Sequence, residues 1–448
     1  MTALTLDMGK FVAGLQYKDI PEEAIPFIHT AFADCVGVMI AGAGEPAPQI
    51  LKSILRSKGT EATLLFGDER GSALDAAWIN GTAAHALDYD DVAQRGHPTV
   101  VIVPAILAEA EAIGASGREM ATAYAAGYEI WAELVRRDPD HQHQKGWHPT
   151  GIFGAVGAAA ACASLHKLNA QQSACAIGIG ASQSAGLISN FGSMTKPFHA
   201  GRSAHAGVVS ARLAKEGFTA SLDAIEHPPG FLAAISVNNR CDVDSPVQLG
   251  TNWSLPRDRF SVKKYPLCFA THSALDGMLD LLRDNRIDAG DVKRITVGVN
   301  ARHAMVLRNH NPRTSLEAKF SMEFAMSCAV IAKRAGLAQI ADAFVCRPDV
   351  QALMTRVTVA PTEEDPQRPG FGINDQITVE TTDGRELRSR ILTEVRGGPG
   401  SPLNRAELWE KFEGCVQAGG SRVHAESLFN SLMTLSEVAN ARDLFKTA

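Results

Sequence analysis

The chain of 448 residues lacks an apolar run long enough to cross a membrane. A spanning helix takes about 20 consecutive apolar residues, whereas the most apolar stretch, residues 31–44, contains Asp34. The first fifteen residues also lack the basic start and the unbroken apolar segment of a secretory signal. These absences argue against a membrane protein and predict a cytoplasmic one.

Strong positive charge and paired cysteines are missing as well. The net charge is −6, which argues against nucleic acid and anionic membranes as partners, because both favour a basic surface. The eight cysteines are scattered and form no closely spaced pair of the kind found in zinc ribbons and redox motifs. We therefore expect free thiols, no metal and no cofactor.

The composition that remains, 45% hydrophobic and 21% charged, is typical of a globular protein. Helical spacing dominates to about residue 285, and short β-like runs follow at 292–299, 356–360, 376–382 and 386–392. A helix is expected over 315–334, between the first two runs, and further helices over 405–416 and 422–445. The pattern predicts a mainly α protein with an inserted α+β domain: a large all-helical domain plus a smaller, lid-like α+β domain. We expect the helical domain over 1–265, the α+β domain over 266–397, and C-terminal helices over 398–448 that return to the helical domain.

The segment 192–201, GSMTKPFHAG, places two proton carriers, Lys196 and His199, three residues apart in what reads as a loop bounded by glycine and proline. Lysine and histidine in loops are most often merely solvated. Here a tract rich in glycine, alanine and serine precedes them, at 174–188, and predicts close helix packing near a core. Arg202 and His205 follow in the next helix, expected at 203–215.

Two further clusters carry histidine. In 85–98, HALDYDDVAQRGHP, carboxylates and imidazoles gather, which suits a divalent metal, capping of helix ends by Asp90 and Asp91, or orientation of a catalytic histidine by Asp88. In 146–151, GWHPTG, His148 directly precedes a helix expected to start near Gly151. An imidazole at a helix N-terminus has a lowered pKa and serves as a general base near neutrality; packing of a loop histidine against Trp147 is the alternative.

The segment 263–268, KKYPLC, lies at the expected junction of the two domains. Adjacent lysines are usually exposed, but small ligands commonly bind at domain junctions. Lys263 is therefore a candidate ligand-binding residue.

Taken together, the four segments 85–98, 146–151, 192–201 and 263–268 resemble the MmgE/PrpD family, which includes 2-methylcitrate dehydratases, cis-aconitate decarboxylases and iminodisuccinate epimerases. The resemblance covers nearly the whole chain. It implies a homodimer that carries out metal-free chemistry on di- or tricarboxylic acids. It also implies an active site lined by five residues of this chain: Asp88, His97, His148, Lys196 and Lys263.

His199, Arg202 and Cys268 lie beside these positions and are added as substrate-binding candidates. The sequence departs from the decarboxylase pattern at three positions: Cys268 stands where those members have histidine, Phe324 where they have tyrosine, and Val92 where they have threonine. The departures disfavour decarboxylation of cis-aconitate, and the cysteine and the wording of the 192–197 segment look more like the epimerase branch.

The reactions of this family create or consume negative charge on the carbon beside a carboxylate, so the site needs a base near that carbon and cations near the carboxylate oxygens. His97 or His148 would supply the base, Asp88 would orient one of them, and Lys196 would protonate a leaving hydroxyl or act as an opposing base. Lys263 and Arg202 would hold remote carboxylates. We expect a hydro-lyase similar to 2-methylcitrate dehydratase, with an epimerase as the alternative.

Two functions of other classes fit the sequence less well. A non-catalytic dimer that only binds acids has no need for His97, His148 and Asp88 together. A magnesium-dependent prenyl-processing enzyme would use Asp88, Asp90 and Asp91 in an aromatic pocket, yet only 6% of the residues are aromatic.

Overall fold

The computed structural model describes residues 3–362 and 373–445, which form two compact units. Unit 1 runs to Phe260 and resumes at Glu407, and unit 2 comprises Ser261–Ala406. The sequence-based boundaries at 266 and 397 lie a few residues inside unit 2. The mainly α fold with a smaller α+β part is confirmed.

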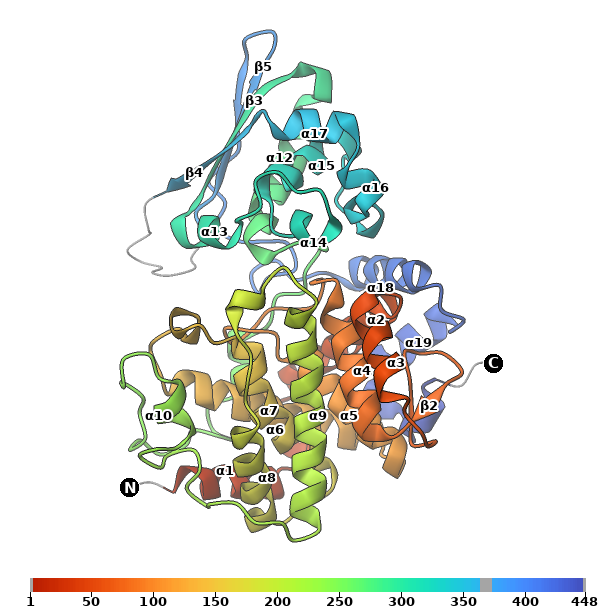
Figure 1. The fold of residues 1–448 in the computed structure, drawn as a ribbon, viewed down its shortest axis with the longest axis vertical. Coiled ribbons are helices and arrows are strands. Elements are labelled where there is room, and N and C mark those ends of the chain that lie inside the picture. Colours follow the sequence, from red (N-terminus) through yellow and green to blue (C-terminus); the bar gives the residue numbers. More distant parts are fainter. Residues whose placement is uncertain (1–2, 363–372, 446–448) are drawn as a thin grey trace. The chain divides into compact units, whose positions relative to one another are not determined.

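Unit 1 is a bundle of helices in which α4, α5, α7 and α9 run alongside one another (Figure 1). Helix α6 packs on α7, α1 packs on α8, and α2 packs on α4. The helices of this unit are α1 (Leu4–Gly14), α2 (Ile25–Gly42), α3 (Pro46–Leu55), α4 (Ala73–Ala86), α5 (Thr99–Ile113), α6 (Gly117–Arg136), α7 (Pro149–Leu165), α8 (Ala170–Ser182), α9 (Thr195–Lys215), α10 (Phe231–Ile235), α11 (Ser254–Asp258), α18 (Arg405–Gly419) and α19 (Ala425–Met433). Two short antiparallel strands of two residues each, β1 (Ala62–Thr63) and β2 (Arg70–Gly71), pair with one another.

Small residues let these helices approach closely, as the sequence predicted. A Cβ atom on Gly201 of α9 would lie 2.2 Å from the backbone carbonyl of Trp78 in α4. Contact this close is possible only for glycine, so α9 rests directly on the backbone of α4. The same contact brings the first turn of α9 to the end of α4, where the acidic segment begins.

One helix of unit 1 has the length and composition of a membrane span: Glu22–Gly42, with a mean hydropathy of 1.6 in its most apolar window. Of that window, 72% is buried inside the folded chain. This degree of burial is typical of a core helix.

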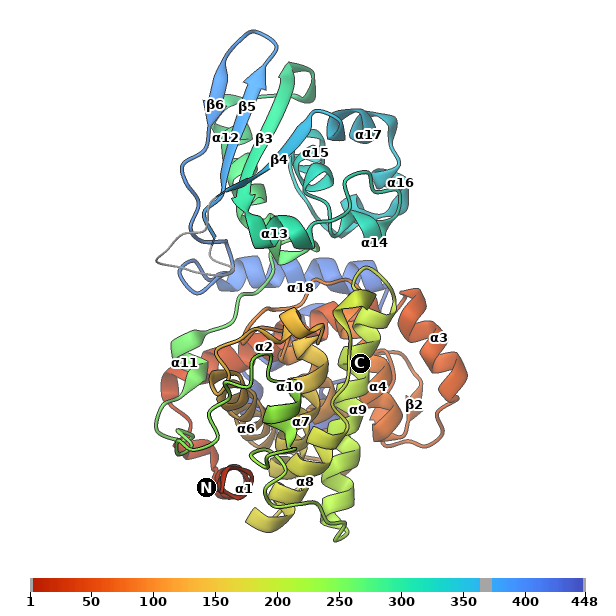
Figure 2. The same cartoon turned by 60° about the vertical axis from the view of Figure 1, so that its left-hand side comes forward.

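Unit 2 holds a four-stranded sheet with the order β4-β3-β5-β6. Strand β3 (Val292–Asn300) is parallel to β4 (Val357–Thr362) and antiparallel to β5 (Gln376–Thr381), which pairs with β6 (Glu386–Arg388). Helices α12 (His272–Asn285) and α15 (Met322–Ala332) pack on the sheet (Figure 2). The parallel connection passes through α15 and four shorter helices: α13 (Ala301–Val306), α14 (Ser315–Ala318), α16 (Asp342–Val345) and α17 (Pro348–Met354).

Four local expectations were wrong. The segment 195–202 is not a loop: α9 starts at Thr195, because the first turn of a helix makes no backbone hydrogen bond that Pro197 would remove. The single helix expected over 315–334 is broken before Ser321, whose side chain caps α15. The strand expected over 386–392 ends at Arg388, and the helix expected over 422–445 is interrupted after Met433.

Candidate active site

Five segments of unit 1 bring their titratable side chains together. His85 lies in the last turn of α4, Asp88 and Asp90 follow it, and His97 precedes α5. His148 is the residue immediately before α7, and Lys196 and His199 lie in the first two turns of α9. All of them except His97 belong to the buried residues of the unit, and the His97 side chain is 13% exposed. The structure thus unites Asp88, His97, His148, Lys196 and His199, all expected from the sequence.

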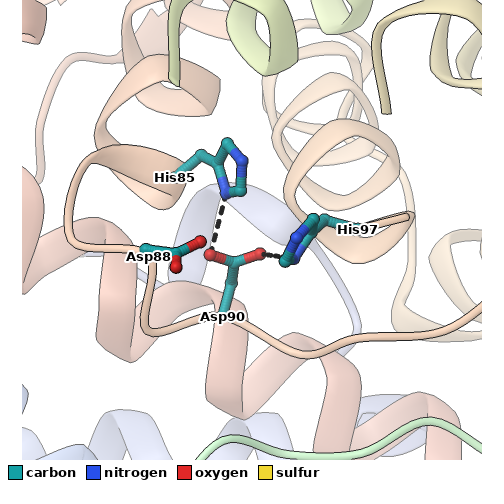
Figure 3. A group of neighbouring side chains, drawn as sticks. All are labelled: His85, Asp88, Asp90 and His97. Carbon is teal, nitrogen blue, oxygen red and sulfur yellow. Dashed lines mark hydrogen bonds and ion pairs between the residues drawn. The ribbon is translucent and has the colours of Figure 1, made fainter. Parts of the chain in front are cut away.

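Asp90 holds two imidazoles at once (Figure 3). Its Oδ1 lies 2.9 Å from Nδ1 of His85, and its Oδ2 lies 2.6 Å from Nδ1 of His97. The Asp91 carbonyl oxygen lies 2.9 Å from the same His97 nitrogen. Because carboxylate and carbonyl oxygens only accept, Nδ1 of His97 must carry the hydrogen, and in the neutral ring Nε2 is left with a lone pair. The geometry therefore prepares His97 to act as a base.

The orienting carboxylate expected at Asp88 is thus Asp90. Neither Asp90 nor Asp91 serves as a helix cap, since the C-cap of α4 is Leu87 and the N-cap of α5 is Pro98. Burial would raise the pKa of Asp90, but the adjacent His85 and His97 outweigh it and hold that pKa well below its usual value. Asp90 is therefore a carboxylate at neutral pH.

Asp88 is paired with Lys196. The ammonium of Lys196 contacts Oδ1 of Asp88, and both side chains are 7% exposed. The ammonium also lies 5.3 Å from the centre of the Phe191 ring, a favourable cation–π contact. A buried lysine beside a carboxylate and an aromatic face has a fixed position, as a proton donor requires.

His148 and His199 form a second imidazole pair. Their Nδ1 atoms lie 3.1 Å apart, so one ring donates a hydrogen to the other. Burial, and then electrostatic interaction with His85 and Lys196, hold the pKa of His148 well below 6.5. Burial and Lys196 also lower the pKa of His199. Both rings are neutral at neutral pH, and the cause for His148 is burial and neighbouring charge more than its position before α7.

His85 extends the cluster toward His148. Its ring is stacked on that of His148, with centroids 6.0 Å apart and planes inclined by 20°. Burial lowers the pKa of His85 to about 4, although Asp90 acts in the opposite direction. The sequence did not single out His85 or Asp90 as site residues. Their spacing from Asp88 could have indicated both residues. His85 lies three positions before Asp88, at the end of α4, and Asp90 lies two positions after it, in the turn that follows.

His85, Asp88, Asp90 and His97 each offer a ligand atom within 4.8 Å of the others, as a divalent metal would need. Each of these groups already has a partner, however. The two imidazole Nδ1 atoms face Asp90, and Asp88 faces the ammonium of Lys196. The Lys196 ammonium thus pairs with Asp88, and the imidazole Nδ1 atoms of His85 and His97 both lie against Asp90.

One expected residue of unit 1 faces away from the cluster. Arg202 is six residues after Lys196 in α9, about 240° further around the helix axis, and its guanidinium stacks 5.8 Å from the centre of the Trp78 ring. Lys263 and Cys268 belong to unit 2, where both are buried and the Cys268 backbone N–H donates to the Lys319 carbonyl at 2.8 Å.

A separate hollow of about 480 Å³ opens in unit 1. Its lining includes Trp147, Ile152, Phe231, Asp223 and His227. None of the clustered carboxylates or of Lys196, His97 and His148 lines it, so the hollow is distinct from the site.

Comparison with known proteins identifies the fold family. The model of the MmgE/PrpD N-terminal domain matches residues 6–244, and that of the C-terminal domain matches residues 265–433. The chain belongs to the MmgE/PrpD family. Among named members, it is 24% identical to cis-aconitate decarboxylase of Mus musculus, over 98% of this chain and 91% of that protein. It is 26% identical to the Homo sapiens enzyme of the same name, over 82% of this chain and 76% of that protein. It is 22% identical to cis-aconitate decarboxylase of Aspergillus terreus strain NIH 2624, over 99% of this chain and 96% of that protein.

The two family matches confirm the resemblance seen in the sequence. The names of the relatives support a lyase. The MmgE/PrpD N-terminal match contains every residue of the buried cluster. Lys263 lies two residues before the C-terminal match, and Cys268 lies inside it.

Proposed function

We propose that this MmgE/PrpD protein is a metal-independent acid–base lyase for a small di- or tricarboxylic acid, and specifically a hydro-lyase of the 2-methylcitrate dehydratase type. One observation carries the proposal: a buried Lys196–Asp88 pair lies next to His97, whose Nδ1 faces Asp90 and the Asp91 carbonyl, so that Nε2 is the nitrogen left to act as a base. An acid and a base in one buried cluster are what the loss of water from a hydroxy acid requires.

In the proposed reaction, Nε2 of His97 removes a proton from the carbon beside a substrate carboxylate. The electron pair of that C–H bond forms the C=C bond as the C–O bond to the hydroxyl breaks. The Lys196 ammonium gives its proton to the leaving hydroxyl, which departs as water. His97 is then protonated and Lys196 neutral, and a net proton transfer from the imidazolium to the amine restores both.

Substrate carboxylates need cations or donors in addition to the acid and the base. We propose Lys263 for a remote carboxylate and His199, with Cys268, for the remaining contacts, on the strength of the family resemblance. Arg202 points to another side of α9, and the proposal gives it no direct contact with substrate. His148 is the second candidate base, because it is neutral and its ring is stacked on that of His85.

Decarboxylation of cis-aconitate is the second candidate function, because three relatives bear that name. Loss of carbon dioxide would use Lys196 to protonate the carbon left behind. Val92, Phe324 and Cys268, which stand where the decarboxylase pattern has threonine, tyrosine and histidine, argue against decarboxylation. The named relatives give epimerisation no support. We further propose that the protein works as a cytoplasmic homodimer, which sedimentation of the purified protein tests.

Proton NMR in D₂O distinguishes the reactions. The purified, chelator-treated protein is incubated separately with 2-methylcitrate, citrate, cis-aconitate and iminodisuccinate. New olefinic signals from a hydroxy acid are expected for the hydro-lyase. Itaconate formed from cis-aconitate would instead support the decarboxylase, and deuterium entry or diastereomer exchange without water loss would support the epimerase. Absence of reaction with all four acids would contradict the proposed substrate class.

A further inference from the structure

A second buried lysine lies behind the acidic segment of the site. Lys411, in α18, is 8% exposed. Its Nζ lies 2.6 Å from Oδ1 of Asp34 in α2 and donates to the backbone carbonyl of Tyr89 at 2.8 Å. The ammonium also lies 4.1 Å from the centre of the Tyr89 ring. Tyr89 is the residue between Asp88 and Asp90, so Lys411 is hydrogen-bonded to the backbone that carries both carboxylates of the site.

Close helix packing places Lys411 there. A Cβ atom on Gly37 of α2 would lie 3.0 Å from the ring of Phe412, the residue after Lys411. Gly37 is one helical turn after Asp34, so the contact brings α18 down onto the turn of α2 that carries Asp34. Phe412, Cys415 and Phe429 line the same small hollow as Asp34 and Lys411.

The backbone of the segment that Lys411 contacts is in an unfavourable conformation. Asp88 has φ +53°, a left-handed conformation that is unfavourable for a residue with a side chain. Such a residue persists only where its surroundings hold it. The contacts on the site side, with Lys196 and the imidazoles, hold the side chains of Asp88 and Asp90, whereas Lys411 holds the main chain between them.

Other buried groups face Lys411 or lie near it. Burial raises the pKa of Asp91 well above its usual value, and Thr99 donates to its Oδ2 at 2.7 Å. Burial also raises the pKa of the thiols of Cys35 and Cys415. Asp34 is the carboxylate that contacts the Lys411 ammonium.

We propose that Lys411 is a positioning residue of the active site, which acts through Tyr89 to hold Asp88 and Asp90 where they meet Lys196 and the two imidazoles. The kinetic part of this inference rests on the proposed function. Its structural part does not, because the mobility of the 88–91 segment is measurable without substrate.

The decisive variant is the double substitution Asp34→Asn with Lys411→Met. It leaves no buried charge without a partner, so it keeps the fold where Lys411→Met alone loses stability. If Lys411 positions the segment, the double variant turns over about 10–100-fold more slowly than the wild type, the usual effect of losing a supporting contact behind an active site. KM is expected to stay within about twofold. Full wild-type turnover would mean that Lys411 only neutralises Asp34, and would overturn the proposal.

Arg212→Met is the matched control. Arg212 pairs with the fully buried Glu109 at 2.8 Å in the same unit, about 24 Å along α9 from Lys196. Its loss is expected to lower stability and leave turnover unchanged. A chemical test adds to this: ethylamine should restore part of the turnover of Lys411→Ala and none of that of Lys196→Arg.

Amide hydrogen exchange provides the readout that needs no substrate. Peptides covering 86–98 are expected to exchange faster in the double variant than in the wild type, and at the wild-type rate in Arg212→Met. If the wild type converts none of the test acids but this difference appears, the proposed function fails and the positioning role stands. Unchanged exchange in the double variant would overturn the positioning role, whatever the activity.

Discussion

Lys196, in the first turn of α9, and Asp88, two residues beyond the end of α4, form an ion pair that is buried on both sides. The pair joins residues that are 108 positions apart in the chain. It forms because α9 lies directly on the backbone of α4 at Gly201. The acid of the proposed reaction is thus placed by helix packing.

Lys196→Ala is expected to lower turnover by about two to four orders of magnitude, the usual contribution of a positioned proton donor. The measurement is the initial rate with the acid that the wild type converts. Lys167→Ala, which removes the same charge from a side chain that is 75% exposed, serves as control and should keep full activity. Turnover of Lys196→Ala near that of the wild type would refute the assignment.

Asp90→Asn should lower turnover by about 10²–10⁴-fold, because an asparagine offers an N–H to one of the two imidazoles and reverses the hydrogen position on that ring. Glu111→Gln is the matched control: Glu111 is a buried carboxylate of the same unit that accepts from Thr63 and Arg70. Rates and thermal midpoints are measured for both variants. Equal activity of the two would show that Asp90 has no orienting role.

Gly201→Ala should lower the free energy of unfolding by about 1–3 kcal/mol, the usual cost of overpacking, and reduce activity through the displaced first turn of α9. Gly414→Ala provides the contrast, since a Cβ atom there meets nothing within 4 Å. In a helix interior it should stabilise by about 0.5–1 kcal/mol. Urea unfolding of both variants gives the comparison, and a neutral Gly201→Ala would contradict the close contact.

Stability should fall as the pH is lowered from 6.5 to about 4. Burial lowers the pKa of His205 from 6.5 to about 4, and it lowers that of His85 likewise. Between these values the unfolded chain binds protons that the folded chain does not, so protonation favours unfolding in this window and stability is fully present above it. His205→Phe keeps a ring against Trp78 and should flatten the dependence of the urea midpoint on pH. An unchanged slope would contradict the lowered pKa.

Treatment with a chelator should leave turnover unchanged, because the carboxylates of the cluster already contact the Lys196 ammonium and two imidazole nitrogens. The measurement is the rate before and after dialysis against EDTA, with metal content determined on the same samples. A loss of activity that zinc or magnesium restores would show that His85, Asp88, Asp90 and His97 hold a metal.

The sequence by itself determined the division into a helical part and a smaller α+β part, because helical and strand periodicity are local properties of the chain. It also determined that Lys196, His97 and His148 are candidates for acid–base chemistry, since their motifs are local too. It misplaced the start of α9 because Pro197 reads as a breaker, although the first turn of a helix tolerates it.

Only the tertiary structure decided which groups meet. That Asp90 and not Asp88 orients His97, that Arg202 faces Trp78, and that Lys411 reaches Tyr89 across 322 positions all depend on how the helices pack. Helix packing depends on the fit of surfaces that are far apart in the chain, such as Gly201 on α4 and Gly37 on Phe412. No local pattern records those fits, so the roles of the residues within the site emerge only when the helices are assembled.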